Sequence, residues 1–392
     1  MTTATYSFGT PSLPEVPLAP EEPAARARRA GRAAFHALRV VSVEPLADES
    51  VTLTVAVPPE LAQEYAFTAG QHLTFRADVD GHAVRRSYSI CDPAPLAGGP
   101  RTLRVGIKRL SGGAFSSWVH DTLQPGEEID VMTPQGHFSV VPDPSAKRRH
   151  VAIAAGSGIT PVLSIVSTLL RDEPESEVTL LYGNRRTSSV MFLEELADLK
   201  DRYPDRLQVL HVMSREAQDA DLLCGRLEPR RVQTLLDAFV ADVTEVDGWY
   251  LCGPFEMVTG VRELLARRGV AAASVHTELF YVEDAPPVTR TREEEEHDAG
   301  EAEVVVSLDG RTSTIRMRSR AQNILAATLQ VRADAPFSCT NGVCGTCRAR
   351  LVEGEVRMDR NFALEPEEIE RGIVLTCQAH PVTDRVVLDY DA

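Results

Sequence analysis

Hydrophobic and polar residues follow three different patterns along this chain of 392 residues. In the first pattern, which begins at Phe35, short runs alternate polar with apolar or β-branched residues, and Gly, Pro and Asp separate the runs. Such regular spacing predicts the strands of an antiparallel barrel or sandwich. The runs are residues 36–46, 50–58, 72–80, 82–90, 101–109 and 127–134.

The second pattern begins after the Pro-rich bridge Val141–Ser145. Buried apolar runs at 151–155, 178–182, 207–213 and 249–253 alternate with segments of helical period at 161–171, 190–200, 228–239 and 255–269. Strand–helix alternation of this kind predicts an α/β domain with a parallel, doubly wound sheet.

The third pattern follows a stretch with Pro, a block of like charges and no apolar period. Residues 303–318 resemble a hairpin and 321–330 a short helix, which predicts a small α+β module. We therefore expect a multidomain protein: a disordered tail at 1–33, a barrel at 34–144, an α/β domain at 145–284, a linker at 285–302 and the α+β module at 303–392.

The charge and the apolar content exclude several classes of protein. The formal net charge of −16 disfavours nucleic acid as a partner. Polar residues break the apolar runs well before membrane-spanning length, and the first residues lack the basic and apolar regions of a signal peptide. We expect a cytoplasmic protein without a membrane partner, whose seven cysteines are reduced.

Four of these cysteines form the most specific motif. Cys339, Cys344 and Cys347 have the spacing C-x4-C-x2-C, and 29 residues separate Cys347 from Cys377. Plant-type ferredoxins hold a [2Fe–2S] cluster with this spacing. Disulfides favour oxidising compartments, and structural zinc sites favour two CxxC-like pairs, so both alternatives fit less well. The run therefore predicts that the α+β module carries single electrons.

Two segments of the barrel indicate a phosphate-bearing aromatic cofactor. The first is Arg86-Ser87-Tyr88-Ser89 within a predicted strand. The second holds Gly112, Gly113 and Ser116 before a possible helix, where backbone N–H groups and hydroxyls can bind phosphate. A plain strand and a serine-capped turn are the alternative interpretations.

The α/β domain carries the pattern of a dinucleotide site. Gly156-Ser157-Gly158-Ile159-Thr160-Pro161 follows a predicted strand and opens a helix, although Pro161 replaces the third glycine of GxGxxG. The next strands end in Asn184-Arg185-Arg186 and Ser214-Arg215. Arg in place of an acidic residue favours NADPH over NADH, unless these arginines are only solvated. Cys252-Gly253 ends the last of these strands, where ligands bind, although a buried Cys is more often a small apolar residue.

The motifs RSYS, GGAFSS, GSGITP, YGNRR and CGPFEM occur in the order found in the ferredoxin–NADP⁺ reductase superfamily, which the chain resembles over about residues 35–392. With its C-terminal plant-type ferredoxin, it resembles the reductase subunits of phenylacetyl-CoA epoxidase complexes. The resemblance implies an FAD-binding antiparallel β-barrel, a doubly wound nucleotide-binding domain and a β-grasp 2Fe-2S domain.

The resemblance also assigns residues to roles. It implies that Ser89, Cys252 and Glu278 act at the flavin and nicotinamide. It implies that FAD is bound by Arg86, Ser87, Tyr88, Ser89, Gly112, Gly113, Ser116 and Phe280. It implies that the nucleotide is bound by Gly156, Gly158, Thr160, Asn184, Arg185, Ser214, Arg215, Cys252 and Gly253. The metal ligands would be Cys339, Cys344, Cys347 and Cys377.

These modules predict an electron relay. NAD(P)H gives two electrons as a hydride, a [2Fe–2S] cluster accepts one at a time, and a flavin does both. The expected path runs from NAD(P)H through FAD and the cluster to the oxygenase subunits of a complex, with the di-iron oxygenase of phenylacetyl-CoA epoxidase as the implied partner. The alternatives are the reductase of another oxygenase, such as a ring-hydroxylating dioxygenase, and a non-catalytic iron–sulfur redox sensor.

Overall fold

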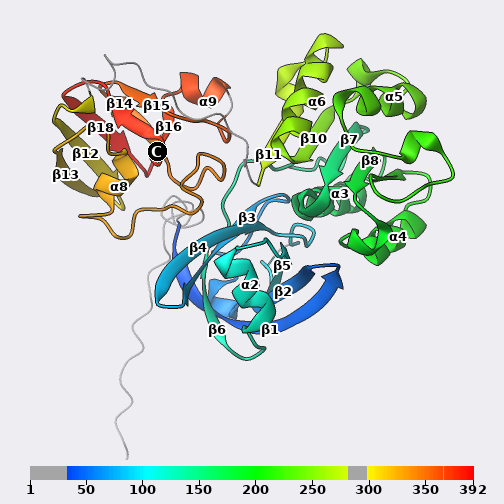
Figure 1. Cartoon of the computed structure of the whole chain (residues 1–392), viewed down its shortest axis with the longest axis horizontal. Helices are drawn as coiled ribbons and strands as arrows, with labels where there is room; N and C mark the ends of the chain where they lie inside the picture. Colours follow the sequence, from blue (N-terminus) through cyan, green and yellow to red (C-terminus); the bar gives the residue numbers. More distant parts are fainter. Residues whose placement is uncertain (1–32, 97, 281–297, 365) are drawn as a thin grey trace, which may run out of the picture.

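The computed structural model describes residues 33–96, 98–280, 298–364 and 366–392. They form three lobes, with the antiparallel domain lying between the two others at the lower centre of Figure 1. The predicted tail at 1–33, except for Ala33, and most of the predicted linker at 285–302 lie outside the described residues. No helix among the described residues combines the length and the apolar character needed to cross a membrane.

The first lobe is an antiparallel barrel of six strands in the order β4-β3-β6-β1-β2-β5. An antiparallel bridge between Ile90, just after β4, and Val105 of β5 joins the two ends of this order. Apolar side chains at alternate positions fill the interior, and helix α2 (Ala114–Asp121) adds Phe115 and Val119 to this core. The strands are β1 (Phe35–Ala47), β2 (Ser50–Ala56), β3 (His72–Val79), β4 (His82–Ser89), β5 (Thr102–Lys108) and β6 (Glu128–Met132).

The second lobe is the predicted doubly wound domain, with a parallel sheet in the order β11-β10-β7-β8-β9. Separate hydrophobic cores lie on the two faces of the sheet, which explains why its strands read as continuous apolar runs. The strands are β7 (Arg149–Ala155), β8 (Glu177–Asn184), β9 (Leu207–Met213), β10 (Gly248–Gly253) and β11 (Val275–Leu279). The helices are α3 (Ile159–Asp172), α4 (Leu193–Arg202), α5 (Pro229–Phe239) and α6 (Phe255–Arg267).

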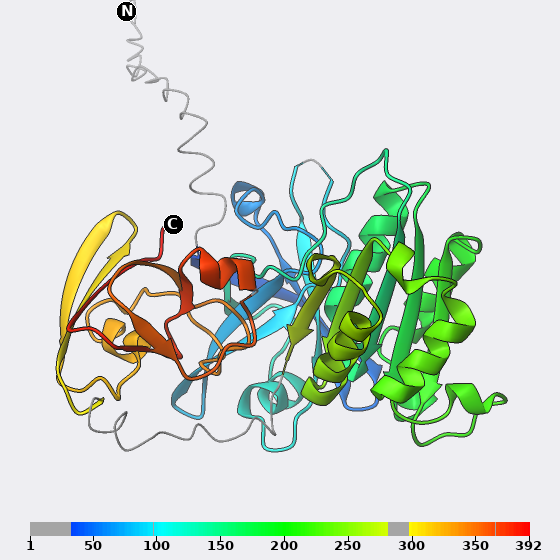
Figure 2. The same cartoon turned by 90° about the horizontal axis from the view of Figure 1, so that it is seen from above.

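The third lobe has the β-grasp fold. Its mixed sheet runs in the order β13-β12-β18-β14-β16, with β12 and β18 parallel, and β15 pairs with β17. Figure 2 shows this lobe beside the barrel, on the side of the α/β domain where β11 lies. The elements are β12 (Ala302–Leu308), β13 (Arg311–Met317), α8 (Ile324–Thr328), β14 (Arg348–Glu353), β15 (Val356–Met358), α9 (Pro366–Glu370), β16 (Ile373–Leu375), β17 (Ala379–Pro381) and β18 (Arg385–Asp389).

Two boundaries differ from the sequence prediction for identifiable reasons. The end of the predicted linker belongs to the β-grasp lobe, because Asp298 is buried there and pairs with Arg357 at 3.0 Å. The helix expected at 321–330 begins only at Ile324, because Asn323 caps it by accepting a hydrogen bond from the backbone N–H of Ala326.

Candidate functional site

The four cysteines of the spacing motif meet at one edge of the β-grasp lobe. Cys339 and Cys344 share one side-chain hydrogen bond, and Cys347 and Cys377 share another. Cys347 and Cys377 are buried, whereas Cys339 and Cys344 are partly exposed. No group of three or more His, Cys, Asp or Glu side chains among the described residues is arranged around a single metal ion. Two thiol pairs instead fit a two-iron cluster with two thiolates on each iron.

Backbone N–H groups of the cysteine loop point at sulfur. The N–H groups of Asn341 and Cys344 lie 3.4 and 3.3 Å from the Cys339 Sγ, and Gly342 turns the loop with a φ of 76°. The hydrogen bond from Cys344, together with these backbone donors, lowers the pKa of Cys339 to about 6 against the opposing effect of burial. These donors favour the thiolate of Cys339, the form that a bound cluster requires, whereas the neighbouring cysteines and burial raise the pKa of Cys344 and Cys347.

The RSYS segment is the end of strand β4, which presents two different faces. Tyr88 stacks on the Phe115 ring at a centroid distance of 5.8 Å, and the exposed Arg86 guanidinium donates to the carbonyl of Arg85. The Ser87 hydroxyl lies instead on the opposite face, 2.8 Å from the Ser338 hydroxyl of the β-grasp lobe. A Tyr ring and an exposed guanidinium on one face suit a flavin ring and its pyrophosphate.

The glycine pair turns directly into α2. Gly112 has a φ of 72°, and no atom lies within 4 Å of where its Cβ would be, so the backbone is open to a ligand. Gly113 is the N-cap of α2. The Ser116 hydroxyl is engaged within the turn, since it accepts from the Leu110 N–H and donates to the Gly113 carbonyl. The open turn at a helix N-terminus fits a phosphate group.

The three residues expected at the flavin and nicotinamide come together where the barrel meets the α/β sheet. The Ser89 hydroxyl donates to Glu278 Oε2 at 3.1 Å. Glu278 is the register partner of Cys252 on the neighbouring strand. Burial raises the pKa of Glu278 to about 8, against the hydrogen bond from Ser89, and burial also raises the pKa of the Cys252 thiol. The carboxyl is therefore a proton donor at neutral pH.

A cavity of about 710 Å³ opens at the carboxyl ends of the parallel strands, next to this triad. It is lined by most of the predicted nucleotide residues, Gly156, Gly158, Asn184, Arg185, Ser214, Arg215 and Gly253, and also by Phe280, which was expected at the flavin. The Asn184 side chain, which lines this cavity, also hydrogen-bonds the Tyr182 hydroxyl, and its buried Nδ2 has no other hydrogen-bond partner among the described residues. Thr160 and Cys252 stand behind this wall: Thr160 donates to the Ser157 carbonyl, and Cys252 is fully buried.

Gly158 shows why the strand–turn–helix joint needs glycine. A Cβ at this position would lie 2.2 Å from the Cys252 carbonyl oxygen, so the turn packs directly on the end of β10. Gly156 needs glycine for another reason, because its φ is 55° and the space around it is open. The joint therefore brings the α3 N-terminus next to Cys252 and leaves an open backbone for pyrophosphate.

Sequence reasoning missed two cations that line the same cavity. Lys108 reaches it from the end of strand β5 of the barrel, and Arg226 lies on the loop before α5. With Arg185 and Arg215 they give the cavity a positive wall. The lowered pKa of Lys108, caused by burial and then by Arg185, reflects this crowding of positive charge. Lys108 reaches the cavity only because the barrel packs beside the α/β domain, so no local sequence motif predicts its role.

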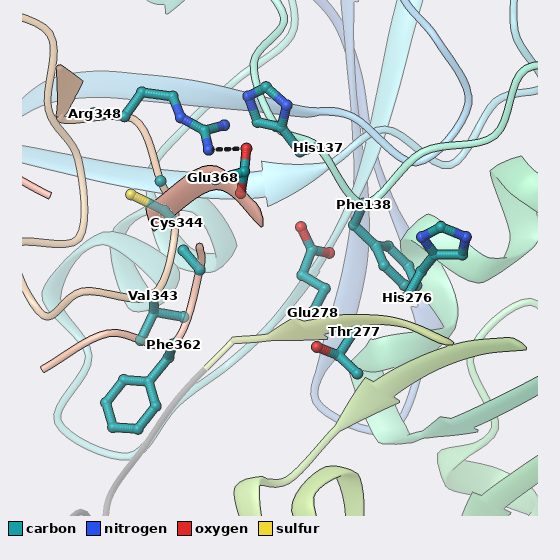
Figure 3. A pocket seen from close by; sticks show the side chains of 13 residues that line it. His137, Phe138, His276, Thr277, Glu278, Val343, Cys344, Arg348, Phe362 and Glu368 are labelled. Carbon is teal, nitrogen blue, oxygen red and sulfur yellow. Dashed lines mark hydrogen bonds and ion pairs between the residues drawn. The ribbon is translucent and has the colours of Figure 1, made fainter. Parts of the chain in front are cut away.

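A much smaller cavity, of about 60 Å³, separates Glu278 from the cysteine loop. Figure 3 shows the Glu278 carboxyl directed from β11 into this gap, with Cys344 and Val343 on the other side. Phe138, Phe362 and the Arg348–Glu368 ion pair are also part of the lining. Of the residues expected at the flavin and nicotinamide, Glu278 therefore lies next to the cysteine loop.

Comparison with known proteins matches each lobe to a protein-family model. Residues 37–140 match the oxidoreductase FAD-binding domain, 152–263 the oxidoreductase NAD-binding domain, and 306–382 the 2Fe-2S iron–sulfur cluster binding domain. Flavin, nicotinamide nucleotide and cluster are thereby the cofactors of this chain, as predicted.

Full-length relatives have the same organisation. One component of the 1,2-phenylacetyl-CoA epoxidase of Escherichia coli K12 is 42% identical over 358 residues, which cover 91% of this chain and 98% of the relative. The ferredoxin reductase component of the 3-ketosteroid-9-alpha-monooxygenase of Mycobacterium tuberculosis is 35% identical, with coverage of 90% and 95%. Phthalate dioxygenase reductase shares the fold with a TM-score of 0.53 at 24% identity, with coverage of 91% and 98%.

Proposed function

This chain belongs to the family of oxygenase reductases that join FAD-binding, NAD-binding and 2Fe-2S domains, and on that premise we propose that it serves a phenylacetyl-CoA epoxidase. It is an NAD(P)H-dependent oxidoreductase that supplies electrons to an oxygenase system, which sets aside the non-catalytic sensor considered from sequence. We propose below which oxygenase it serves, which nucleotide it prefers and which residues bind the cofactors.

The observation that carries the electron path is the position of Glu278. It bonds Ser89 of the barrel on one side and faces the cysteine loop across the small gap on the other. When bound, FAD accepts a hydride and gives up electrons singly, which is the conversion that a [2Fe–2S] cluster needs. In this proposal Ser89 and Glu278 hold a proton beside the flavin, and Cys252 sits behind the nicotinamide.

The two faces of β4 and the lining of the large cavity indicate which residues bind each cofactor. Arg86 and Tyr88 hold the flavin pyrophosphate and ring, with Gly112, Gly113 and Ser116 at the phosphates. Gly156, Gly158, Asn184 and Gly253 would form the backbone side of the nucleotide site, and Phe280, in the wall of the same cavity, would contact the flavin ring. Thr160 supports the turn from behind. In the proposal Ser87 serves the β-grasp lobe through Ser338 rather than the flavin.

NADPH is the nucleotide that the cavity favours. Arg185, Arg215, Lys108 and Arg226 line it, whereas Glu228 and Glu256 are the acidic residues in its wall. A 2′-phosphate adds negative charge that these cations can pair with, in the way that Arg accommodates NADP. Ser214 and Arg215 follow β9 and lie beside the adenosine ribose in this proposal.

The choice of oxygenase rests on the 42% identity to the epoxidase component. The reductase of a 3-ketosteroid monooxygenase is the second candidate, because a relative with that name is 35% identical over a similar length. The net charge of −16 and the seven free cysteines support a cytoplasmic protein that does not bind nucleic acid.

The test combines the purified reductase with purified oxygenase subunits of each type. We expect NADPH oxidation to accelerate when phenylacetyl-CoA is added with the epoxidase subunits, with formation of the epoxide. The matched control replaces these subunits with the 3-ketosteroid oxygenase and its substrate. Coupling to the steroid and none to phenylacetyl-CoA would assign the chain to the second candidate.

A further inference from the structure

The β-grasp lobe rests on the outer face of the β3–β4 hairpin of the barrel. The Ser87 hydroxyl donates to the Ser338 hydroxyl at 2.8 Å and also lies 3.0 Å from the Thr74 hydroxyl. Next to this pair, the Arg85 guanidinium lies over the Phe337 ring, 3.9 Å from its centroid. Phe337 and Ser338 immediately precede Cys339, so these contacts hold the start of the cysteine loop.

This face of the hairpin is set by strand alternation. His72 is the register partner of Ser89, Thr74 of Ser87, and Arg76 of Arg85, so these polar side chains lie on one side of the two strands. The other side of β4 carries Arg86 and Tyr88, which we assign to the flavin. A single strand therefore separates the flavin face from the cysteine loop, except at its end, where Ser89 of the outer side donates to Glu278 beside the proposed flavin site.

His72 joins residues of all three domains. Its Nε2 lies 3.4 Å from the Thr346 hydroxyl of the cysteine loop, and its Nδ1 lies 4.0 Å from Oε1 of Glu278 on β11. His72 is only 3% exposed, and Glu278 in turn accepts a hydrogen bond from Ser89. His72 thus stands between the residue beside the flavin and the loop between Cys344 and Cys347.

The α/β domain holds the same loop from the other side by apolar contacts. Val343 is buried in the core that α6 and β10 form, and Phe362 meets Phe255 at the start of α6 in an edge-to-face contact of 5.4 Å. Polar contacts to the barrel and apolar contacts to the α/β domain therefore hold the cysteine loop in one place.

We propose that the outer face of the β3–β4 hairpin is the docking surface on which the β-grasp domain receives electrons, with His72 as its positioning residue. The proposal rests on the proposed function, because it needs flavin and cluster as donor and acceptor. In the docked state one electron at a time passes from the reduced flavin to the oxidised cluster, and no atom crosses the gap. Docking thereby sets the rate of cluster reduction without changing hydride transfer.

The first test locks the docked state in the full-length holoenzyme. Ser87→Cys combined with Ser338→Cys replaces two hydroxyls 2.8 Å apart with thiols, a geometry that a disulfide of about 2.0 Å can close after mild oxidation. The matched control is Ser307→Cys with Thr312→Cys, a cross-strand pair 3.4 Å apart within the β-grasp domain. Rapid mixing with NADPH measures flavin reduction and then cluster reduction, and electron paramagnetic resonance verifies that the cluster is intact.

We expect the locked enzyme to reduce its cluster in a single turnover as fast as the control does. If the locked enzyme reduces its flavin but not its cluster, the docked state is not the state of electron entry and the proposal is wrong. If the unmodified enzyme itself fails to reduce its flavin with NADPH, the proposed function fails instead, so the two failures are distinguishable.

The second test weakens the dock. We expect His72→Ala to slow flavin-to-cluster transfer by about fivefold or more, the effect of losing roughly 1 kcal/mol of hydrogen bonding. His72→Gln, which keeps a donor and an acceptor, should restore part of the rate. Phe337→Ala should slow the same step, whereas His82→Ala, an exposed His at the far end of β4, should not. Equal cluster-reduction rates in all four variants would overturn the proposal.

Discussion

The nucleotide cavity and the gap at the cysteine loop differ in almost every physical respect. The first has a volume of about 710 Å³ and a wall with four cationic side chains. The second has about 60 Å³ and lies between Glu278, Phe138 and the loop that carries Cys344. Glu278 lines only the second cavity, but its register partner Cys252 directly precedes Gly253 in the wall of the first, and His72 lies 4.0 Å from its carboxylate.

This contrast follows from what each side must transfer. Hydride transfer requires the nicotinamide ring to reach the flavin and the oxidised nucleotide to leave, so that side needs an open site with groups that bind phosphate. Electron transfer moves no atoms, so the cluster side can be closed and held by packing. Substitutions can therefore alter one side at a time.

The largest effect is expected from removing a cluster ligand. Cys347→Ala takes away a buried thiol, so the cluster should not assemble, and NADPH-dependent reduction of cytochrome c should fall to background. Direct reduction of ferricyanide from the flavin should largely persist, because the nucleotide cavity is untouched.

The control for this variant is Cys224→Ala, at a partly exposed Cys of the α/β domain. It should keep both activities and the visible spectrum of the cluster. Loss of ferricyanide reduction in Cys347→Ala would show that the two sides are not separable.

The second effect concerns pH and Glu278. Burial raises the pKa of this carboxyl to about 8, so folding favours its protonated form. Its contribution to stability is complete below the ordinary Glu pKa of about 4.3 and is lost as the pH rises through about 8. Glu278→Gln cannot ionise, so its free energy of unfolding should fall less over this range, by up to about 4 kcal/mol.

Urea unfolding of the holoenzyme between pH 5 and pH 9 gives the comparison. Glu263→Gln, at an exposed Glu of α6, is the control and should follow the unmodified protein. Parallel curves for Glu278→Gln and the unmodified protein would contradict a raised pKa at Glu278.

The third effect concerns the nucleotide preference of the large cavity. Arg215→Ala should lower the preference for NADPH over NADH by about 10- to 100-fold, since a hydrogen bond to a charged group contributes about 1.5–3 kcal/mol. Arg185→Ala should act in the same direction. The readout is the ratio of kcat/KM for the two nucleotides. Arg230→Ala, an exposed Arg next to the cavity residue Pro229, should leave this ratio unchanged. An unchanged ratio in Arg215→Ala removes that residue from the site.

The smallest effect separates the two glycines of the nucleotide turn. Gly158→Ala places a methyl group against the Cys252 carbonyl, so it should cost about 1–3 kcal/mol of stability and raise the KM for NADPH. Gly156→Ala meets no neighbour and should cost about 1 kcal/mol, from its positive φ alone. Thermal unfolding measures both, and the reverse order would contradict the packing of this turn on β10.

Local rules predict the elements of this protein better than its contacts. The spacing of Cys339 to Cys347 identifies the cluster because covalent geometry alone brings three thiols onto one loop. The turn at Gly156 is readable because strand, glycines and helix follow one another. Strand period likewise predicts the barrel and the parallel sheet. Each of these signals lies within a few consecutive residues.

Some contacts join residues that are far apart in the chain, and no sequence pattern predicts them. His72 and Thr346 are separated by 274 positions, and Lys108 reaches the nucleotide cavity from another domain. The start of α4 also differs from the predicted helix at 190–200: Phe192 takes a left-handed φ of 59°, so the helix begins at Leu193. Tertiary packing, not local preference, determines these features.

The two-faced strand β4 also limits how this protein can change. Because side chains alternate with a period of two, deleting or inserting one residue before Arg86 would exchange the two faces. Ser87 would then point at the flavin, and Tyr88 at the β-grasp domain. A point substitution in β4 therefore changes one face and leaves the other intact. A change in the length of β4 would disrupt the flavin contacts and the β-grasp contacts at once. Homologous reductases that exchange their ferredoxin domains should keep the length of this hairpin.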